Sequence, residues 1–280
     1  MREDGAAMAH FYTEFEARLA KGETLTELDV ADMLQAERAK RPYFVDLSFD
    51  TIAGFNPNGA LPHYRATEYS HAELQGDGLL LIDSGAQYQD GTTDITRTIA
   101  LGPVSEKMKR IYTLVLKAHI QIELVKFPDG ASGTQLDAVG RRCLWREGLN
   151  YLHGTGHGVG SYLSVHEGPH QIRMEWKPTP LRAGMTITDE PGIYLAGEFG
   201  VRIENTLLVT NYVQTDFGKF LQMEPLTLCP IDTAPIEMEL MTSEEKMWLN
   251  DYHRMVFEKL SPWLEEDDKN WLKEATKPLK

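Results

Sequence analysis

Apolar residues recur at helical spacing through the first forty residues of the chain. Residues 6–19 place apolar side chains three and four positions apart, and residues 25–39 form a second amphipathic stretch. Thr24 and Glu27 have the spacing of a capping box at the start of this second stretch. The pattern therefore predicts two N-terminal helices.

Strand-like patterns follow, and the first two adjoin acidic residues. The apolar run 78–82 ends at Asp83, and the alternating run 94–99 begins at Asp94. Asp90-Gly91 between the two runs is a hairpin turn signal. An antiparallel pair here would bring the two aspartates close together.

A second pair of strand-like segments lies later in the chain, at residues 185–194 and 201–209. A turn centred on Gly197 would pair them antiparallel and place Glu190 opposite Glu204. The two pairs are separated by helical patterns and by a glycine-rich segment that contains His153 and His157.

Three further helical stretches carry start signals or apolar periodicity. Ser105 is a cap for a helix that runs to about residue 126, and residues 135–146 form the next helix. A capping box made by Thr242 and Glu245 opens an acidic helical tail. The tail carries Trp248, Trp263 and Trp271.

The order of these elements repeats, because helices precede a carboxylate-bearing strand pair twice. Short echoes support the repeat: residues 26–29 resemble 134–137, and residues 94–96 resemble 204–206. We therefore predict an α+β fold in which residues 1–240 form one domain of two pseudo-symmetric halves. Residues 241–280 form a C-terminal helical extension.

Composition narrows the function classes. The 280 residues carry 42 acidic and 28 basic side chains, a formal net charge of −14, which disfavours nucleic acid and anionic membranes as partners. The chain start lacks an apolar signal segment, and no apolar run approaches the length of a membrane span. Cys143 and Cys229 fit two buried thiols in a reducing compartment, so a cytoplasmic protein is expected.

Acidic residues at the ends of apolar strands are costly to bury unless they are paired or bound to metal. Four such carboxylates and one imidazole could converge on two divalent cations, which would lower the pKa of a shared water towards ~7 and form a nucleophile. An oxygen-rich set favours manganese, cobalt, iron or magnesium over a thiolate-type zinc site. The candidate ligands are Asp83, Asp94, His157, Glu190 and Glu204.

Each of these signals has a simpler structural explanation when it is taken alone. Asp83 and Asp94 could be turn or cap residues, and Glu190 could flank a tight turn at Pro191-Gly192. Arg202 could be a surface partner of Glu204. The combination of two carboxylate pairs around one histidine favours a metal site.

With these residues in view, the chain resembles the catalytic domain of the Xaa-Pro aminopeptidases of the pita-bread metallopeptidase family, in its eukaryotic-type cytosolic branch. The resemblance extends from about residue 5 to 275. It is carried by residues 82–88, 93–98, 151–160, 165–169, 189–192 and 202–205.

The resemblance implies a pita-bread fold around a curved antiparallel sheet and a dinuclear centre, with manganese first and cobalt, iron or zinc as alternatives. It implies cleavage between an N-terminal residue and a penultimate proline by a metal-bridging hydroxide. Asp94 and Glu204 would be the bridging ligands, and Glu190 would also shuttle protons. The other implied catalytic residues are His63, His153, His166 and Arg202.

The family carries creatinase-like domains ahead of the catalytic domain, and these 280 residues show none, so we expect the chain to be either an excised catalytic fragment or a naturally short form. We expect peptides with a penultimate proline as partners. A homodimer is the candidate assembly. Two alternatives remain: a prolidase that cuts only Xaa-Pro dipeptides, and a peptidase-like binding module without catalysis. The complete ligand set disfavours the second alternative.

Overall fold

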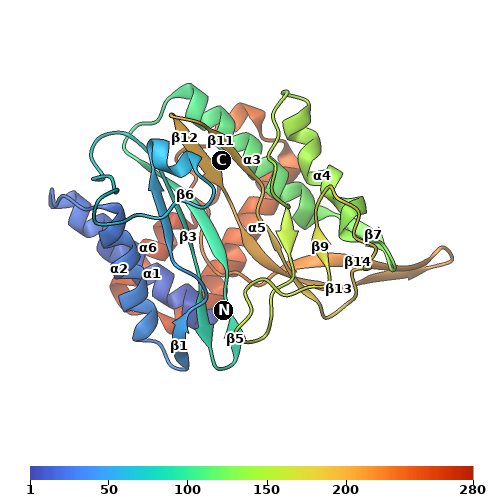
Figure 1. The fold of residues 1–280 in the computed structure, drawn as a ribbon. Helices are drawn as coiled ribbons and strands as arrows, with labels where there is room; N and C mark the ends of the chain where they lie inside the picture. The colour runs from blue at the N-terminus through green and yellow to red at the C-terminus, as the bar shows by residue number, and fades with distance from the viewer. Residues whose placement is uncertain (280) are drawn as a thin grey trace.

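The structure is a computed structural model, and it describes residues 1–279. Groups of helices and groups of strands follow one another along the chain (Figure 1). The helices are α1 (Arg2–Ala20), α2 (Glu27–Ala39), α3 (Glu106–Leu124), α4 (Gly133–Trp145), α5 (Ser243–Leu260) and α6 (Glu266–Ala275), with 3-10 turns η1 (Asn56–Ala60), η2 (Met238–Leu240) and η3 (Ser261–Trp263). The strands are β1 (Phe44–Leu47), β2 (Ile52–Phe55), β3 (Gly78–Ser84), β4 (Ala86–Tyr88), β5 (Gly91–Thr92), β6 (Ile95–Leu101), β7 (Lys126–Pro128), β8 (Gly156–His157), β9 (Gln171–Ile172), β10 (Thr186–Asp189), β11 (Gly192–Leu195), β12 (Phe199–Arg202), β13 (Asn205–Thr215) and β14 (Gly218–Pro225).

The predicted two-half arrangement is confirmed. In the first half, α1 and α2 pack beside an antiparallel sheet with the order β2-β3-β6. In the second half, α3 and α4 accompany an antiparallel sheet with the order β10-β13-β14-β7. The β11–β12 hairpin lies between the two sheets, where β12 contacts β3, β6 and η1.

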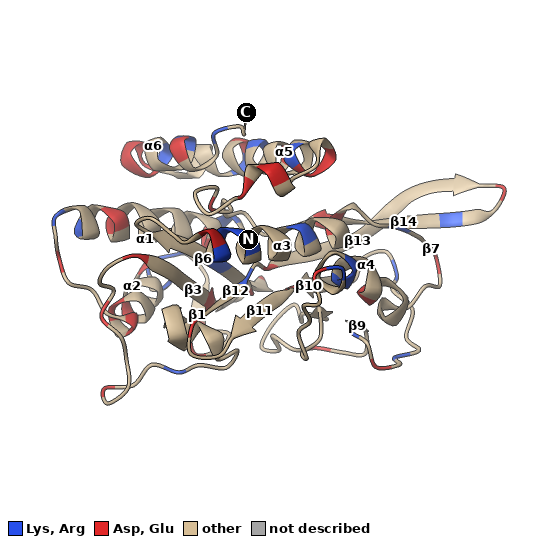
Figure 2. Cartoon of the chain, turned by 90° about the horizontal axis from the view of Figure 1, so that it is seen from above, with Lys and Arg blue, Asp and Glu red and all other residues tan. Residues whose placement is uncertain are grey.

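The molecule is layered. Figure 2 shows α5 and α6 as an outer layer over α1 and α3, and the strands lie beneath those two helices. One buried apolar cluster joins α3, the β11–β12 hairpin and the tail helices, and two smaller clusters fill the two halves. The helices thus cover one face of the sheets, and the other face is left to shorter strands and loops. No helix within residues 1–279 is long and apolar enough to cross a membrane.

The tail helices dock through two of the three predicted tryptophans. Trp248 of α5 lies edge-on to the ring of His119 in α3, with ring centroids 5.8 Å apart, and Trp271 of α6 stacks on Tyr12 of α1, with ring centroids 5.3 Å apart. Trp263, between these helices, remains 45% exposed. Aromatic stacking of this kind adds to the apolar area buried when the tail packs on the body.

The predicted strands 185–194 and 201–209 are each divided into two. The first breaks at Glu190 and the second at Glu204. The antiparallel register continues across the breaks, so these residues still face each other between the pairs Asp189–Asn205 and Gly192–Arg202. The backbone N–H of Glu190 donates to the Thr155 carbonyl and that of Glu204 to the Thr96 carbonyl, which turns both segments out of the simple ladder.

Two predicted helix starts are confirmed and one is wrong. Ser105 accepts a hydrogen bond from Met108 N–H at the start of α3, and Thr242 forms the predicted capping box with Glu245 at α5. The capping box of α2 is made by Thr26 and Asp29, because this helix begins at Glu27 and not at residue 25.

Glu27 has a different task from the predicted cap. Its buried carboxylate accepts hydrogen bonds from the backbone N–H groups of Phe55 and Ala72 and from the side chains of Asn58 and Tyr64. It therefore ties the loop after β2 to α2, and the partners that it needs come from distant parts of the chain.

Smaller shifts accompany this correction. The turn between β4 and β5 is Gln89-Asp90, one residue before the predicted Asp90-Gly91. The echo between residues 26–29 and 134–137 does not align the helix starts, because α4 is capped by Ser132 and not by Thr134.

A glycine contact joins the two halves. Gly200 in β12 lies directly against Gly59 in η1, and a Cβ atom on Gly200 would overlap the Gly59 carbonyl oxygen. Only glycine allows the two backbones to approach this closely without a shift of either.

Candidate metal centre

All the predicted site residues line one cavity of about 390 Å³. We call it the metal-site cavity; its volume is in the range of small-ligand sites. The predicted residues that line it are His63, Asp83, Asp94, His153, His157, His166, Glu190, Arg202 and Glu204.

Local backbone features aim the carboxylates into this cavity. Asp83 lies near the end of β3, opposite Thr96 of β6, and Asp94 stands just before β6 begins. Glu190 and Glu204 occupy the two strand breaks described above. Each carboxylate thus sits at a strand end or interruption, where the side chain can leave the alternating pattern of a continuous strand.

Three candidate ligands form a tight group. One ligand atom from each of Asp94, His157 and Glu204 lies within 4.8 Å of the others. His157 Nε2 is 3.3 Å from Asp94 Oδ2 and 3.6 Å from Glu190 Oε1. His157 Nδ1 lies 2.9 Å from the Gly158 carbonyl oxygen, which fixes the ring with Nε2 towards the carboxylates.

The environment of these carboxylates disfavours their charged forms. Burial raises the pKa of Glu190 to about 8 and that of Asp94 to about 6, and it raises the pKa of Glu204 well above its usual value. Mutual repulsion among these groups and Asp83 adds to the rise. Burial opposes charge on His157, yet hydrogen bonding to Asp94 raises the pKa of His157 to about 9.

These features fit divalent cations. Asp83 Oδ1 is buried without a hydrogen-bond partner among residues 1–279, so this oxygen is free to ligate. Four carboxylates line this largely buried space beside His157 and Arg202, and Arg173 on the same wall is paired with Glu175, so all four carboxylates can be ionised together only if positive charge is added. Oxygen-rich donor sets of this kind suit hard or borderline divalent ions.

Arg202 organises the wall of the cavity. One of its terminal nitrogens donates to Asp83 Oδ2 over 2.6 Å, and the other donates to the Tyr194 hydroxyl over 2.7 Å. Tyr194 lies 2.9 Å from His153 Nε2. Arg202 thereby connects a candidate ligand to a candidate catalytic histidine through one hydroxyl group.

The three histidines outside the ligand group have different environments. Burial lowers the pKa of His153 to about 4, so this ring is neutral at pH 7. His166 is exposed with its ring centroid 4.2 Å from that of His157, and burial of part of the ring together with the charge of His157 lowers its pKa. His63 is also exposed on the cavity wall.

A second, fully buried cluster lies next to the cavity and was missed by sequence reasoning. His119 Nδ1 is 3.0 Å from Asp189 Oδ2, and His119 Nε2 is 3.3 Å from Glu123 Oε1. Asn205 donates to Glu123 over 2.7 Å and accepts from Arg97, which also donates to the Glu204 carbonyl. The spacing of His119 and Glu123, one helical turn apart on a predicted helix, was the available signal.

Tyr194 and Thr96 were also missed. Thr96 Oγ1 donates to Glu204 Oε2 over 2.7 Å, so it orients a candidate ligand. Both residues are polar positions within strands, and the sequence alone gives no reason to expect the contacts that they make; only Tyr194 lines the cavity itself.

Sequence profiles of one known protein family match most of the chain. The sequence profile of metallopeptidase family M24 matches residues 1–211, and the profile of the C-terminal region of peptidase M24 matches residues 219–279. The chain belongs to metallopeptidase family M24. The predicted division at residue 240 stays a prediction.

Curated relatives of this M24 chain cover almost all of it. It is 45% identical over 284 residues to the probable Xaa-Pro aminopeptidase P of Paracoccidioides brasiliensis, covering 99% of this chain and 46% of the relative. The probable Xaa-Pro aminopeptidase P of Laccaria bicolor is 44% identical, with 99% and 44% covered. The chain spans about half the length of the curated relatives it matches.

Solved structures show the same fold. The X-prolyl aminopeptidase of Caenorhabditis elegans, described as a cytosolic enzyme with a di-nuclear active site, matches with a TM-score of 0.94 and 40% identity, covering 99% of this chain and 46% of that one. The prolidase of Pyrococcus furiosus matches with a TM-score of 0.66 and 31% identity, covering 80% and 62%. These matches confirm the predicted pita-bread fold.

Proposed function

We propose that this M24 chain is a metal-dependent Xaa-Pro aminopeptidase, which releases an N-terminal residue from peptides whose second residue is proline. One observation carries the proposal: Asp94, His157 and Glu204 converge in one cavity together with Asp83 and Glu190. The names of the fungal and nematode relatives supply the substrate class.

We assign the five converging residues as ligands of two divalent ions, with manganese as the first candidate and cobalt, iron or zinc as alternatives. Asp94 and Glu204 would be shared by both ions, and Asp83, His157 and Glu190 would complete the set. When bound, such ions generate a nucleophile from water at neutral pH and polarise the scissile carbonyl.

The remaining steps depend on side chains of this chain. Glu190 is the candidate proton shuttle, because its carboxylate lies in the metal-site cavity with Oε1 3.6 Å from His157 Nε2, where it can accept a proton from the attacking water and release it to the leaving nitrogen of proline. His166 and His63 reach the cavity from its exposed rim, where they can hold the peptide and exchange protons with it.

Arg202 and His153 hold neighbouring side chains in position. Arg202 fixes Asp83 Oδ2 and the Tyr194 hydroxyl, so its replacement would release both. His153 stays neutral, since burial disfavours its charged form, and its Nε2 lies at the Tyr194 hydroxyl. Both nitrogens of this neutral ring are engaged, Nδ1 at the Gly154 carbonyl and Nε2 at the Tyr194 hydroxyl, so His153 holds Tyr194 in place without adding charge to the site.

A prolidase is the second candidate, because the Pyrococcus furiosus prolidase shares the fold at 31% identity. The two activities differ in whether the cavity accepts chain beyond proline. Rates on Xaa-Pro and Xaa-Pro-Xaa peptides, measured side by side, separate them. A prolidase would cut only the dipeptide.

Metal removal tests the metal dependence. Protein treated with a chelator and dialysed should lose release of the first residue from an Xaa-Pro-Xaa peptide, and manganese should restore it. Activity that persists at full rate without metal would contradict the proposal. A non-catalytic binding module would also fail to retain metal by elemental analysis.

Location and assembly belong to the same proposal. The cytosolic description of the nematode relative supports a cytoplasmic location for this chain. A homodimer stays a prediction, and light scattering of the purified chain would test it.

A further inference from the structure

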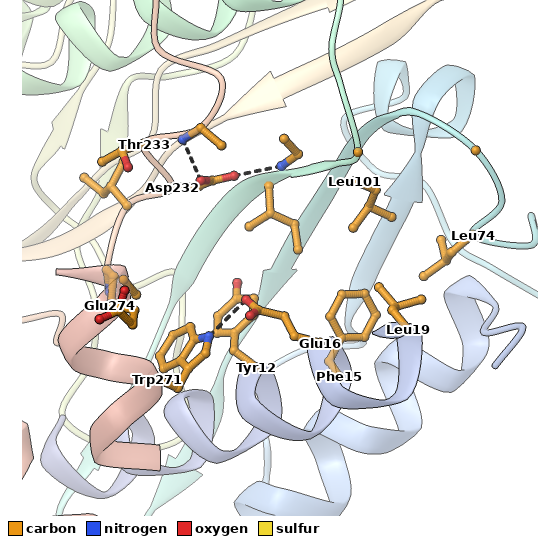
Figure 3. A pocket seen from close by; sticks show the side chains of 18 residues that line it. Tyr12, Phe15, Glu16, Leu19, Leu74, Leu101, Asp232, Thr233, Trp271 and Glu274 are labelled. Atoms are coloured by element: carbon orange, nitrogen blue, oxygen red, sulfur yellow. Dashed lines mark hydrogen bonds between the residues drawn. The ribbon is translucent and has the colours of Figure 1, made fainter. Parts of the chain in front are cut away.

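A second cavity of the protein is larger than the metal-site cavity. A cavity of about 610 Å³ lies between α1, α6, the end of β6 and residues 230–234 (Figure 3). We call it the acidic cavity. Its volume suits a small organic ligand, and sites for such ligands combine apolar walls with a few placed polar groups.

The inner wall of the acidic cavity is apolar. Phe15 and Leu19 from α1, Leu74 from the loop before β3, and Ile99 and Leu101 from β6 line it. Figure 3 shows Phe15, Leu19, Leu74 and Leu101 directed into the space between α1 and β6. Phe15, Leu74 and Leu101 are already almost fully buried. A hydrophobic ligand body would therefore fill the space beside them and would cover the partly exposed Leu19 and Ile99.

The polar groups of the acidic cavity are all acidic or neutral. None of the 18 lining residues is lysine, arginine or histidine. Three carboxylates stand among them, on Glu16, Asp232 and Glu274. An anionic ligand would therefore meet only repulsion, and a cation would meet attraction.

Two of these carboxylates lack a counter-charge. Within residues 1–279, no basic side chain lies within ion-pair distance of Glu16 or Asp232; Glu274 is paired with Lys277. Asp232 is partly buried, and its oxygens accept hydrogen bonds from the N–H groups of Ala100 and Ala234. Burial raises the pKa of both unpaired carboxylates, which reflects the cost of a negative charge without a partner.

Two aromatic rings, those of Tyr12 and Trp271, lie at the rim of the acidic cavity. Trp271 Nε1 donates to Glu16 Oε1 over 2.9 Å, and the indole stacks on Tyr12. The hydroxyl of Tyr12 is buried without a hydrogen-bond partner among the described residues, although Tyr12 lines the cavity. The wall thus offers an unused polar group and aromatic surface, and aromatic faces attract organic cations.

We propose that the acidic cavity binds a small amphipathic organic cation, with an apolar or aromatic body against the inner wall and one ammonium group between Glu16 and Asp232. This site is separate from the metal-site cavity, since the two share no lining residue. Such a ligand would bridge α1 and the C-terminal helix α6, so binding would raise the melting temperature of the protein.

Three probes with a shared phenyl body test the charge preference. Calorimetric titration of the manganese-loaded protein with 2-phenylethylammonium, 2-phenylethanol and 3-phenylpropionate should give binding in that order. The ammonium should bind at least about tenfold more tightly than the alcohol, a difference of about 1.4 kcal/mol. Equal binding of ammonium and alcohol would overturn the proposal, and so would an absence of binding by all three.

Variants locate the site. Glu16→Gln and Asp232→Asn should each weaken ammonium binding about fivefold to tenfold, since each removes a charge-assisted contact. Glu14→Gln, an exposed position on the same helix that does not line the cavity, should leave it unchanged. Unchanged binding by both cavity variants would overturn the proposal, and Glu16→Gln decides alone if Asp232→Asn does not fold, because Glu16 lies at the exposed rim.

A further control separates this site from the metal centre, which is also acidic. Asp94→Asn should leave ammonium binding intact if the ligand occupies the acidic cavity. Loss of binding in Asp94→Asn with normal binding in Glu16→Gln would assign the ligand to the metal-site cavity. Failure of the proposed peptidase activity would leave this titration unaffected.

Discussion

Two imidazole–carboxylate clusters lie side by side at the end of β10, and successive residues supply them. Asp189 turns to His119 and Glu123 in a fully buried group, whereas Glu190 turns to His157, Asp94 and the metal-site cavity. The residue types are the same. The balance of charge is different.

In the buried group one imidazole lies between two carboxylates. Burial opposes its charge, but Asp189 and Glu123 raise the pKa of His119 to about 9, so it carries a proton at neutral pH. In the open group four carboxylates exceed what His157 and Arg202 can offset. In the buried cluster His119 contacts both carboxylates and Asn205 donates to Glu123, so its own residues hold the group together and it serves as structure. The four carboxylates of the open cluster can all be ionised only with added cations, so this cluster can serve as a reaction centre.

The largest effect should follow from removing a shared ligand. Glu204→Gln should lower peptidase turnover at least about 10³-fold, because metal-dependent stabilisation of the reacting groups is lost. In metal-free protein the same change relieves repulsion among carboxylates and should raise the free energy of unfolding by about 1 kcal/mol.

Steady-state assays, elemental analysis and chemical denaturation measure these effects. Glu198→Gln, in the hairpin turn after β11, is the matched control and should keep full activity. Full turnover in Glu204→Gln would remove the distinction between the two clusters.

The next effect concerns the buried cluster. His119→Phe keeps the ring volume but leaves Asp189 and Glu123 buried without a counter-charge, so it should destabilise the fold by about 3–5 kcal/mol. His253→Phe is the matched control, because His253 is buried and burial lowers its pKa to about 4, and it accepts one hydrogen bond from Ile231 N–H. Urea denaturation should show the smaller loss in the control, and equal losses would contradict the ion-pair reading of the cluster.

A smaller effect is expected at the rim of the open cluster. His166→Ala should reduce turnover by about 10²-fold, within the usual range for proton-transfer groups, with the metal content unchanged. His71→Ala, an exposed histidine outside the metal-site cavity, should have no effect. Loss of metal from His166→Ala would make His166 a ligand and not a substrate-binding group.

The sequence alone indicated the residues of the open cluster in the metal-site cavity, but it gave little sign of the buried cluster around His119. Asp83, Asp94, Glu190 and Glu204 were visible because carboxylates at the ends of apolar strands conflict with burial, and such conflicts mark functional positions. His119 gave a weaker signal, since its partner Asp189 comes from another segment seventy residues away. Only the tertiary fold brings them together.

The strand breaks and the start of α2 could not be predicted from the sequence either, because they too depend on tertiary contacts. Continuous apolar alternation predicted unbroken strands, whereas Glu190 and Glu204 direct their N–H groups to Thr155 and Thr96. Likewise Glu27 fitted a capping box by spacing, but Thr26 and Asp29 make the cap. Local patterns fix element types well and leave the choice among nearby hydrogen-bond partners to tertiary contacts.

The smallest expected effect is the pH dependence of the buried cluster. The pKa of His119 is raised to about 9 in the folded protein against about 6.5 in an unfolded chain, so its stabilising contribution is complete below pH 6.5 and is lost as pH rises through 9. Burial also raises the pKa of Asp189 to about 7, which acts in the same direction. The free energy of unfolding should fall by about 1–3 kcal/mol between pH 7 and pH 9.

Denaturation curves at several pH values would measure this fall, and His119→Phe should flatten it. A wild-type profile that rises over the same range would contradict the assigned charge state of the cluster.

The contact between Gly59 and Gly200 has a consequence for the site that neither cluster reveals. Asp83 and Asp94 come from the half that contains Gly59, and His157, Glu190 and Glu204 come from the half that contains Gly200. A methyl group at Gly200 would push the two halves apart and would lengthen the distances between the ligands that the two halves supply. The close approach of these two backbones is therefore one of the contacts that hold the two sides of the metal centre at their spacing, together with the bridge between Thr96 and Glu204.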